Sequence, residues 1–164
     1  MKKLFFLLAA TTMTIVAAQA QTPIKYQGEV DLGYSVGIGD FAAHRINIHT
    51  IQGVKIGNYF STGLGIGADL YHEDGIDVML PIYLNLKGYL PTKTKVTPFI
   101  SMDLGAGIGV SEYVTGLSGF YCTPAVGVKT RKFKVQLGYN IQQLSESGIS
   151  ISMSAIQIKV GYVF

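Results

Sequence analysis

Apolar and polar residues alternate with a period of two along most of the chain after Lys25. Clusters of Gly, Pro, Asp, Ser or Lys interrupt the alternation and leave eight segments. They run approximately over residues 26–39, 45–57, 59–71, 76–90, 95–110, 119–129, 133–142 and 155–164. Because successive side chains of a strand point to opposite faces, this pattern predicts eight β-strands.

The predicted connections alternate in length. They are tight at residues 57–58, 91–94 and 130–132, and longer at 40–44, 72–75, 111–118 and 143–154. Short turns at one end and longer loops at the other are typical of up-and-down transmembrane β-barrels. An even number of strands places both ends of the chain at the short-turn end.

The two faces of the predicted strands differ in chemistry. One face is aliphatic and uncharged, with Thr50, Gln52 and Thr62 as its polar exceptions. The opposite face holds most of the glycine and the following charged residues: Glu29, Asp31, Arg45, Lys55, Asp69, Lys87, Asp103, Lys129, Lys134 and Lys159.

Glycine and charge on the same face distinguish two kinds of barrel. In a soluble, lipocalin-like barrel the charged face is outside, where nothing limits side-chain size and glycine weakens the strand. In a small membrane barrel the charged face points into a crowded lumen, and the large aliphatic residues face lipid. We therefore predict an all-β protein, an eight-stranded antiparallel transmembrane β-barrel.

Aromatic residues gather at the short-turn ends of the predicted strands. They are Tyr26, Tyr59, Phe60, Tyr89, Phe133, Tyr162 and Phe164. A girdle of aromatic side chains at the membrane interface would have this placement. Ordinary strand propensity of aromatic residues is the alternative explanation.

The apolar phase shifts near the end of the chain. Ile149, Ile151 and Met153 have odd numbers, whereas the apolar positions from Ile156 onwards are even. The shift predicts either a bulge near Ser154 or a strand that begins after it.

The first twenty residues have the three parts of a secretory signal. Lys2 and Lys3 precede an apolar stretch over residues 4–16, and Ala18-Gln19-Ala20 provides a small-residue cleavage site. The stretch is shorter than the roughly 20 apolar residues that a spanning helix needs. We therefore predict a signal peptide at residues 1–20 and one barrel domain at residues 21–164.

Composition agrees with an exported membrane barrel. Charged residues make up only 14%, against about 25% in soluble domains, and mean hydropathy is +0.33. Without Lys2 and Lys3 the net charge falls from +3 to +1, so no nucleic-acid partner is expected. Cys122 is the single cysteine, so no internal disulfide is expected.

The chain resembles the small outer-membrane barrels of the OmpA transmembrane-domain and OmpX type, and the porin-family outer-membrane β-barrel domains. The resemblance covers residues 21–164, and it is most evident at residues 80–87 and in the glycine alternation of residues 103–109. A terminal Phe164 preceded by apolar residues at every second position resembles the C-terminal strand by which such barrels are recognised for assembly. The resemblance implies a Gram-negative outer-membrane location, reached through the periplasm.

Charged residues of the predicted lumen are candidates for an ion-pair network. Glu29 and Asp31 have heights similar to that of Lys159, counted from the short-turn ends. Nearer the outer mouth, Asp69 and Asp103 are placed to meet Arg45 and His49. Because an unpaired charge in a narrow lumen is costly, we expect these groups to compensate one another. The network either fills and stabilises the barrel or lines a narrow ion path.

Outer-loop residues offer an alternative, enzymatic function. His44, His72, Asp74 and Asp77, with Ser111 and Ser118, lie on or near predicted outer loops, where some eight-stranded lipid A-modifying barrels place His and Ser. Residues scattered over separate loops do not define a Ser-His-Asp arrangement, so we expect no enzyme.

The expected function is structural, in envelope integrity or surface interaction, with a filled polar lumen. The expected partners are outer-membrane lipid and lipopolysaccharide, and the barrel-assembly machinery through the strand ending at Phe164. We expect a monomer without cofactor or metal. A lipid A-modifying acyl transferase or deacylase and a narrow ion channel remain the alternatives.

Overall fold

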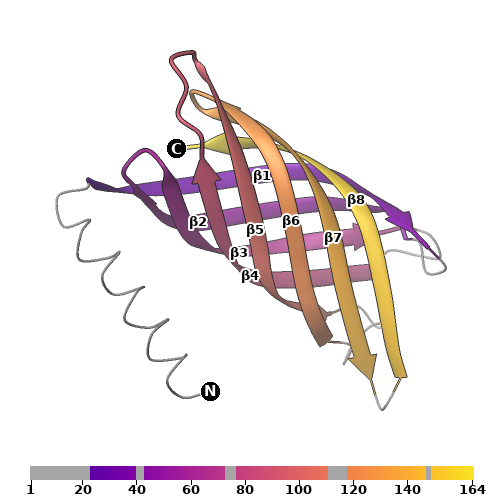
Figure 1. The fold of residues 1–164 in the computed structure, drawn as a ribbon. Coiled ribbons are helices and arrows are strands. Elements are labelled where there is room, and N and C mark those ends of the chain that lie inside the picture. The colour runs from indigo at the N-terminus through magenta and orange to yellow at the C-terminus, as the bar shows by residue number, and fades with distance from the viewer. Residues whose placement is uncertain (1–22, 40–42, 73–76, 111–117, 147–148) are drawn as a thin grey trace, which may run out of the picture.

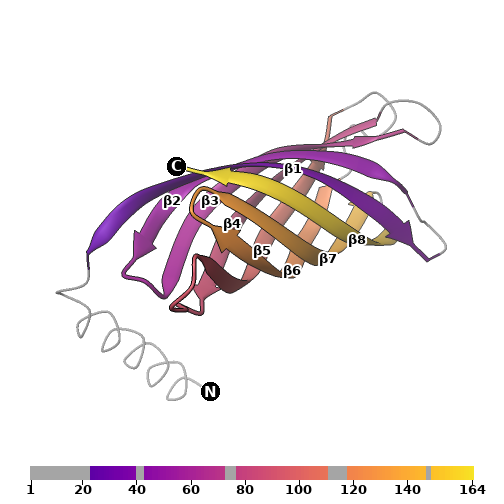
Figure 2. The same ribbon diagram turned by 90° about the horizontal axis from the view of Figure 1, so that it is seen from above.

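The computed structural model describes residues 23–39, 43–72, 77–110, 118–146 and 149–164, and these residues form eight strands. The strands are β1 (Ile24–Ile38), β2 (Arg45–Ile56), β3 (Phe60–Tyr71), β4 (Asp77–Tyr89), β5 (Val96–Gly109), β6 (Ser118–Thr130), β7 (Phe133–Glu146) and β8 (Ile149–Val163). Each strand pairs antiparallel with the next, and β8 pairs with β1, which closes the barrel (Figures 1 and 2). The predicted fold class is therefore confirmed. Within the described ranges, helices long and apolar enough to cross a membrane are absent.

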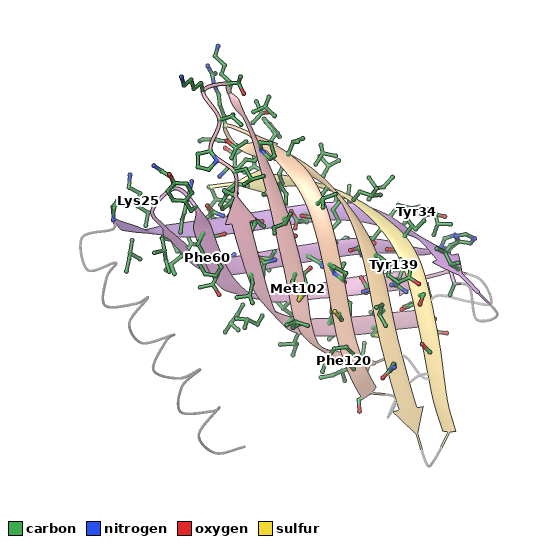
Figure 3. The ribbon with its side chains drawn as sticks, in the orientation of Figure 1. Lys25, Tyr34, Phe60, Met102, Phe120 and Tyr139 are labelled. Carbon is green, nitrogen blue, oxygen red and sulfur yellow. The ribbon has the colours of Figure 1, made fainter. Side chains whose placement is uncertain are left out.

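The two faces lie as the alternation predicts. The outer surface is covered by large hydrophobic side chains, and Figure 3 shows Phe60, Met102, Phe120 and Tyr139 directed away from the barrel. The lumen holds polar and charged side chains that are almost completely buried. This inside-out distribution is what a barrel surrounded by lipid requires.

The barrel has two distinct ends. The end with Ile24 and Phe164 also carries the turns at residues 57–59, 90–95 and 131–132, and we call it the terminal rim. The opposite end, where β1, β3, β5 and β7 end and β2, β4, β6 and β8 begin, is the loop rim. In the turn between β2 and β3, Gly57 adopts a φ of 60°, a backbone conformation that favours glycine.

The last hairpin differs from the prediction. The predicted long connection at residues 143–154 is wrong, because β7 continues to Glu146 and β8 already begins at Ile149. The register of β8 against both neighbours is continuous through Ser154, so there is no bulge there. Met153 consequently faces inward and packs beside Tyr71 and Met79. The change in apolar phase at Met153 therefore does not reflect a break in the strand. It reflects an apolar side chain on the inner face, at a height where the lumen wall becomes partly apolar.

The aromatic girdle is present at the terminal rim except for one residue. Tyr26, Tyr59, Phe60, Phe133, Tyr162 and Phe164 are exposed on the outside. Tyr89 was placed in the girdle wrongly, because it faces the lumen and is only 4% exposed. There its hydroxyl accepts a hydrogen bond from Gln27 Nε2 at 2.9 Å, and it lies 3.3 Å from Ser61 Oγ.

Candidate functional site: the filled lumen

The part of the lumen nearest the terminal rim is held by a carboxylate shared between two lysines. Glu29 on β1 lies 2.7 Å from Lys87 Nζ of β4 and also pairs with Lys134 of β7. Lys134 Nζ lies 2.9 Å from Asp31 Oδ2 as well. Because the three strands come from different sides of the barrel, the cluster ties opposite walls together.

The middle of the lumen is built around His49 on β2. Its Nδ1 lies 3.1 Å from Lys159 Nζ, and its Nε2 lies 2.9 Å from Asp69 Oδ1. The same Nδ1 lies 3.0 Å from the hydroxyl of Tyr83, whose ring stacks on Tyr121 at a centroid distance of 5.5 Å. These rings occupy the centre of the barrel, where a continuous water path would have to run.

Asp103 on β5 completes this middle layer. Its Oδ2 lies 3.8 Å from Lys159 Nζ, and its Oδ1 accepts a hydrogen bond from Asn85 Nδ2 at 2.5 Å. The pair of Asp103 and Lys159 spans the lumen between β5 and β8. It is therefore a cross-link rather than a contact between neighbouring strands.

Arg45 fills the lumen nearest the loop rim. Its guanidinium donates to Tyr71 Oη at 3.0 Å and to Asn140, and its Nε lies 3.8 Å from Asp69 Oδ2. Tyr71 in turn donates to Gln142 Oε1 at 2.7 Å. Hydrogen bonds to an arginine fork fix geometry as well as charge, so this layer is ordered.

Two glycines of β3 make room for the central rings. A Cβ atom added at Gly65 would collide with the Tyr83 ring, and one added at Gly67 would collide with the His49 ring. The sequence interpretation, that glycine shares the charged face because the lumen is crowded, has its physical basis in these contacts.

The fully buried charges of the described lumen balance one another: four carboxylates, Glu29, Asp31, Asp69 and Asp103, and four cations, Arg45, Lys87, Lys134 and Lys159. Two further inward-facing cations, Lys55 and Lys129, are half-buried over the Tyr89 ring near the terminal rim. A cavity beside Glu29 measures about 10 Å³, roughly the space of a single water. At the level of Glu29 the side chains therefore leave little free space in the lumen.

The structure changes some of the expected pairings. Asp69 meets Arg45 and His49 as expected. The expected pairing of Glu29 and Asp31 with Lys159 is wrong, and Asp103 does not form the expected ion pair with Arg45. Lys159 pairs with Asp103 instead. The lysines that neutralise Glu29 and Asp31 are Lys87 and Lys134.

The height of Lys159 in the barrel explains why it does not pair with Glu29 and Asp31. On the β1–β8 ladder it stands opposite Gly33, nearer the loop rim than Glu29 and Asp31. Counting residues from each turn neglects strand tilt, which offsets heights between distant strands.

The loop candidates do not assemble into a catalytic arrangement in the described residues. His44 directly precedes β2 at the loop rim and stacks on Tyr34, with ring centroids 6.3 Å apart. His72 is exposed after the end of β3, and Asp77 begins β4 opposite Tyr71. Asp74 and Ser111 lie outside the described residues, whereas Ser118 begins β6. Over the described ranges, His, Cys, Asp and Glu do not form a group of three able to hold a metal ion.

The lumen contains functional residues that sequence reasoning missed. Tyr83, Tyr121 and Phe99 are buried aromatic rings on inward positions, where the alternation predicted polar side chains. Their inward orientation could have been read from the sequence. Each lies an even number of residues from a charged residue of its own strand: Lys87, Asp103 or Lys129. An aromatic residue in phase with charges is the signal that would have placed them in the lumen.

Neither a protein-family model nor a curated protein matches the chain by sequence. Among solved structures, the chain is similar to Neisserial surface protein A, with a TM-score of 0.65, 10% identity, and coverage of 86% of this chain and 97% of that one. It is similar to the outer-membrane enzyme PagL, with a TM-score of 0.60, 10% identity, and coverage of 82% and 98%.

A third similar structure is the N-terminal β-barrel domain of OprF from Pseudomonas aeruginosa, with a TM-score of 0.53, 13% identity, and coverage of 87% of this chain and 100% of that one. At these identities the likeness concerns the fold alone. The chain has the fold of small eight-stranded outer-membrane β-barrels.

Proposed function

We propose that the chain is an outer-membrane protein of a Gram-negative bacterium, with the terminal rim in the periplasm and the loop rim outside. The apolar outer surface and the aromatic residues of the terminal rim support membrane insertion. The signal-like segment at residues 1–20 supports export. Similarity of fold to three outer-membrane barrels supports the location.

We propose further that the protein acts as a closed barrel, in envelope integrity or surface interaction, and not as a pore. One observation carries this proposal: the described part of the lumen is filled by a network of buried ion pairs and hydrogen bonds that links the walls in three layers. An eight-stranded barrel has an interior just wide enough for side chains to fill it. A protein built to conduct would leave that interior partly hydrated.

The proposed role is non-enzymatic. Among the described residues, the ring of His44 stacks on that of Tyr34 and His72 is exposed after the end of β3, which favours a structural role for both. We propose a monomer whose partners are outer-membrane lipid and lipopolysaccharide. Recognition by the barrel-assembly machinery would use the strand that ends at Phe164.

Replacement of Lys159 tests the closed barrel. The mature protein and its Lys159→Met variant are folded in detergent, checked by heat-modifiable gel mobility, and placed in planar bilayers. A filled lumen predicts no steady conductance from either protein, and a lower unfolding temperature for the variant because Asp103 loses its buried cation. Lys93→Met, at an exposed hairpin, is the matched control.

Steady single-channel conductance of the wild-type protein that Lys159→Met alters would overturn the closed barrel and favour the ion path. Absence of a heat-modifiable folded form would contradict the membrane barrel itself.

A further inference from the structure

The outer surface near the terminal rim contains an apolar groove of about 570 Å³. It crosses four strands, from the start of β5 to β8, and its lining includes Ile100, Val126, Val128, Val135, Leu137 and Ile158. The short Val126, Val128 and Val135 lie on its two middle strands together with Leu137, and Ile100 and Ile158 stand on the outer strands. The groove therefore has the chemistry and shape to receive a hydrocarbon chain.

Two basic hairpins lie at the end of this groove. The β4–β5 hairpin carries Lys93 and Lys95, and the β6–β7 hairpin carries Arg131 and Lys132, all exposed. Val96 pairs with Thr130 at the last step of the β5–β6 ladder, so the two hairpins are neighbours on the rim (Figure 1). Neither turn contains Asp or Glu.

Hydrogen bonds close the backbone of both hairpins. In the first, the hydroxyls of Thr92 and Thr94 both donate to the carbonyl of Val96, which closes the turn around Lys93 and Lys95. In the second, the Lys132 carbonyl accepts a hydrogen bond from the amide of Val163 at 2.7 Å. The basic side chains therefore project from turns whose backbone is fixed.

Arg131 gives an independent indication. Its φ is 50°, in the left-handed region that a non-glycine residue occupies at a cost. A glycine at residue 131 would adopt this backbone conformation without strain, and no described side-chain contact would be lost. Backbone outliers of this kind cluster at ligand-binding sites, and this one lies in the hairpin between the groove strands β6 and β7.

We propose that the groove and the two basic hairpins bind an anionic phospholipid of the periplasmic leaflet. The acyl chain lies along the valines of β6 and β7, and Lys95 and Arg131 contact the headgroup phosphate. The inference rests on the proposed outer-membrane barrel with its terminal rim in the periplasm. Charge complementarity at the rim selects an anionic headgroup over a zwitterionic one.

The absence of tryptophan from the chain makes a clean test possible. The groove reporter is the Ile100→Trp variant, and the matched control reporter is the Leu64→Trp variant. Both positions are the fifth residue of their strands, counted along the chain, and they are 62% and 68% exposed. Each protein is reconstituted in phosphatidylcholine vesicles containing brominated phosphatidylglycerol or brominated phosphatidylcholine at equal mole fraction.

Brominated lipid quenches a tryptophan that it touches, so quenching reports the lipid at each reporter. We expect brominated phosphatidylglycerol to be preferred by at least about fivefold at the groove reporter, since a single basic residue near an anionic headgroup already confers that much, and not at the control reporter. When Lys95→Gln and Arg131→Gly are added to the groove reporter, the preference should disappear, although Gly suits the backbone at residue 131. High salt should weaken it.

Equal quenching by the two lipids at the groove reporter, or the same preference at both reporters, would overturn the phospholipid site while leaving the barrel intact. A preference that survives Lys95→Gln and Arg131→Gly would overturn the role of the cations. Failure of both reporters to be quenched by either lipid would instead contradict membrane insertion, and with it the proposed function.

Discussion

Lys134 and Asp31 form an ion pair across a strand that separates them. Lys134 lies on β7 and Asp31 on β1, with Nζ 2.9 Å from Oδ2. The residue between them on β8 is Gly161, which pairs with Asp31 on one side and with Lys134 on the other. Only a residue without a side chain leaves the space through which the lysine reaches the carboxylate.

Replacing Gly161 by Ala should therefore break this pair. The added Cβ would lie 2.6 Å from Lys134 Cε and still closer to Asp31 Oδ1. We expect the free energy of unfolding to fall by about 1–3 kcal/mol, the usual cost of overpacking. Urea titration of the protein in vesicles, followed by heat-modifiable mobility, measures the change.

Gly88→Ala is the matched control for this substitution. Gly88 faces outward on β4, and the nearest atom that its Cβ would meet is Ile100 Cγ1 at 3.6 Å, an ordinary contact. Its free energy of unfolding should stay unchanged or rise by up to about 1 kcal/mol. Equal losses at the two glycines would show that the ion pair is not what Gly161 protects.

Glu29 should be the most sensitive charge of the network. It pairs with both Lys87 and Lys134, so Glu29→Gln leaves two buried ammonium groups with one remaining carboxylate, Asp31. We expect a loss of about 3–5 kcal/mol, as for other broken buried pairs. Adding Lys87→Met should recover part of that loss, because it removes the unpaired charge.

A double-mutant cycle over Glu29 and Lys87 measures the recovery. We expect a coupling of about 0.5–3 kcal/mol between the two positions. Glu29→Gln combined with Lys93→Met, at an exposed hairpin, should show no coupling. Additive effects of Glu29→Gln and Lys87→Met would contradict the shared-carboxylate arrangement.

Much of this lumen was predictable because strand periodicity is local. Whether Glu29 or Lys134 faces inward follows from its position in the alternation of its own strand. A shift of the strand by one residue would turn every inward side chain outward. Partners across the lumen are not local. Lys159 meets Asp103 on the far wall because barrel diameter and strand tilt set the height of each side chain, and these arise only when eight strands close.

The prediction of the hairpin between β7 and β8 failed for a different reason. Met153 has the parity of the polar face, and an apolar residue there was read as a break in the strand. In the structure it packs in the lumen beside Met79 and Tyr71, where the network gives way to apolar contacts. Alternation predicts on which face of the strand a side chain lies. The polarity of one residue does not show whether that face meets water or other side chains.

The rate at which Cys122 reacts should show whether lipid covers this part of the outer surface. It lies in β6 on the outward-facing side, opposite Leu104 of β5 and Ile141 of β7. In vesicles a water-soluble maleimide should label it slowly, because lipid covers this part of the surface. Urea-unfolded protein should be labelled at once, and mass spectrometry counts the adduct on this single cysteine.

A second thiol provides the control for Cys122. In a Cys122→Ala background, Thr94→Cys places the thiol in the exposed β4–β5 hairpin at the terminal rim. It should be labelled rapidly in proteins whose terminal rim faces the bulk solution. Rapid labelling of Cys122 in folded, vesicle-inserted protein would contradict the placement of β6 in lipid.

Removing the central rings should open the lumen that the wild-type protein keeps closed. Tyr83 and Tyr121 stack on each other in the middle of the barrel, and both are almost fully buried. The Tyr83→Ala/Tyr121→Ala variant leaves a polar-walled void beside His49, Asp103 and Lys159, which water can enter because several polar groups face it. We expect a small conductance in planar bilayers where the wild-type protein shows none. Tyr139→Ala, which removes an outward-facing ring, should leave the barrel closed. If the double variant folds, as heat-modifiable mobility would show, and remains as silent as Tyr139→Ala, then the layers at Arg45 and Glu29 each close the lumen without the aromatic pair.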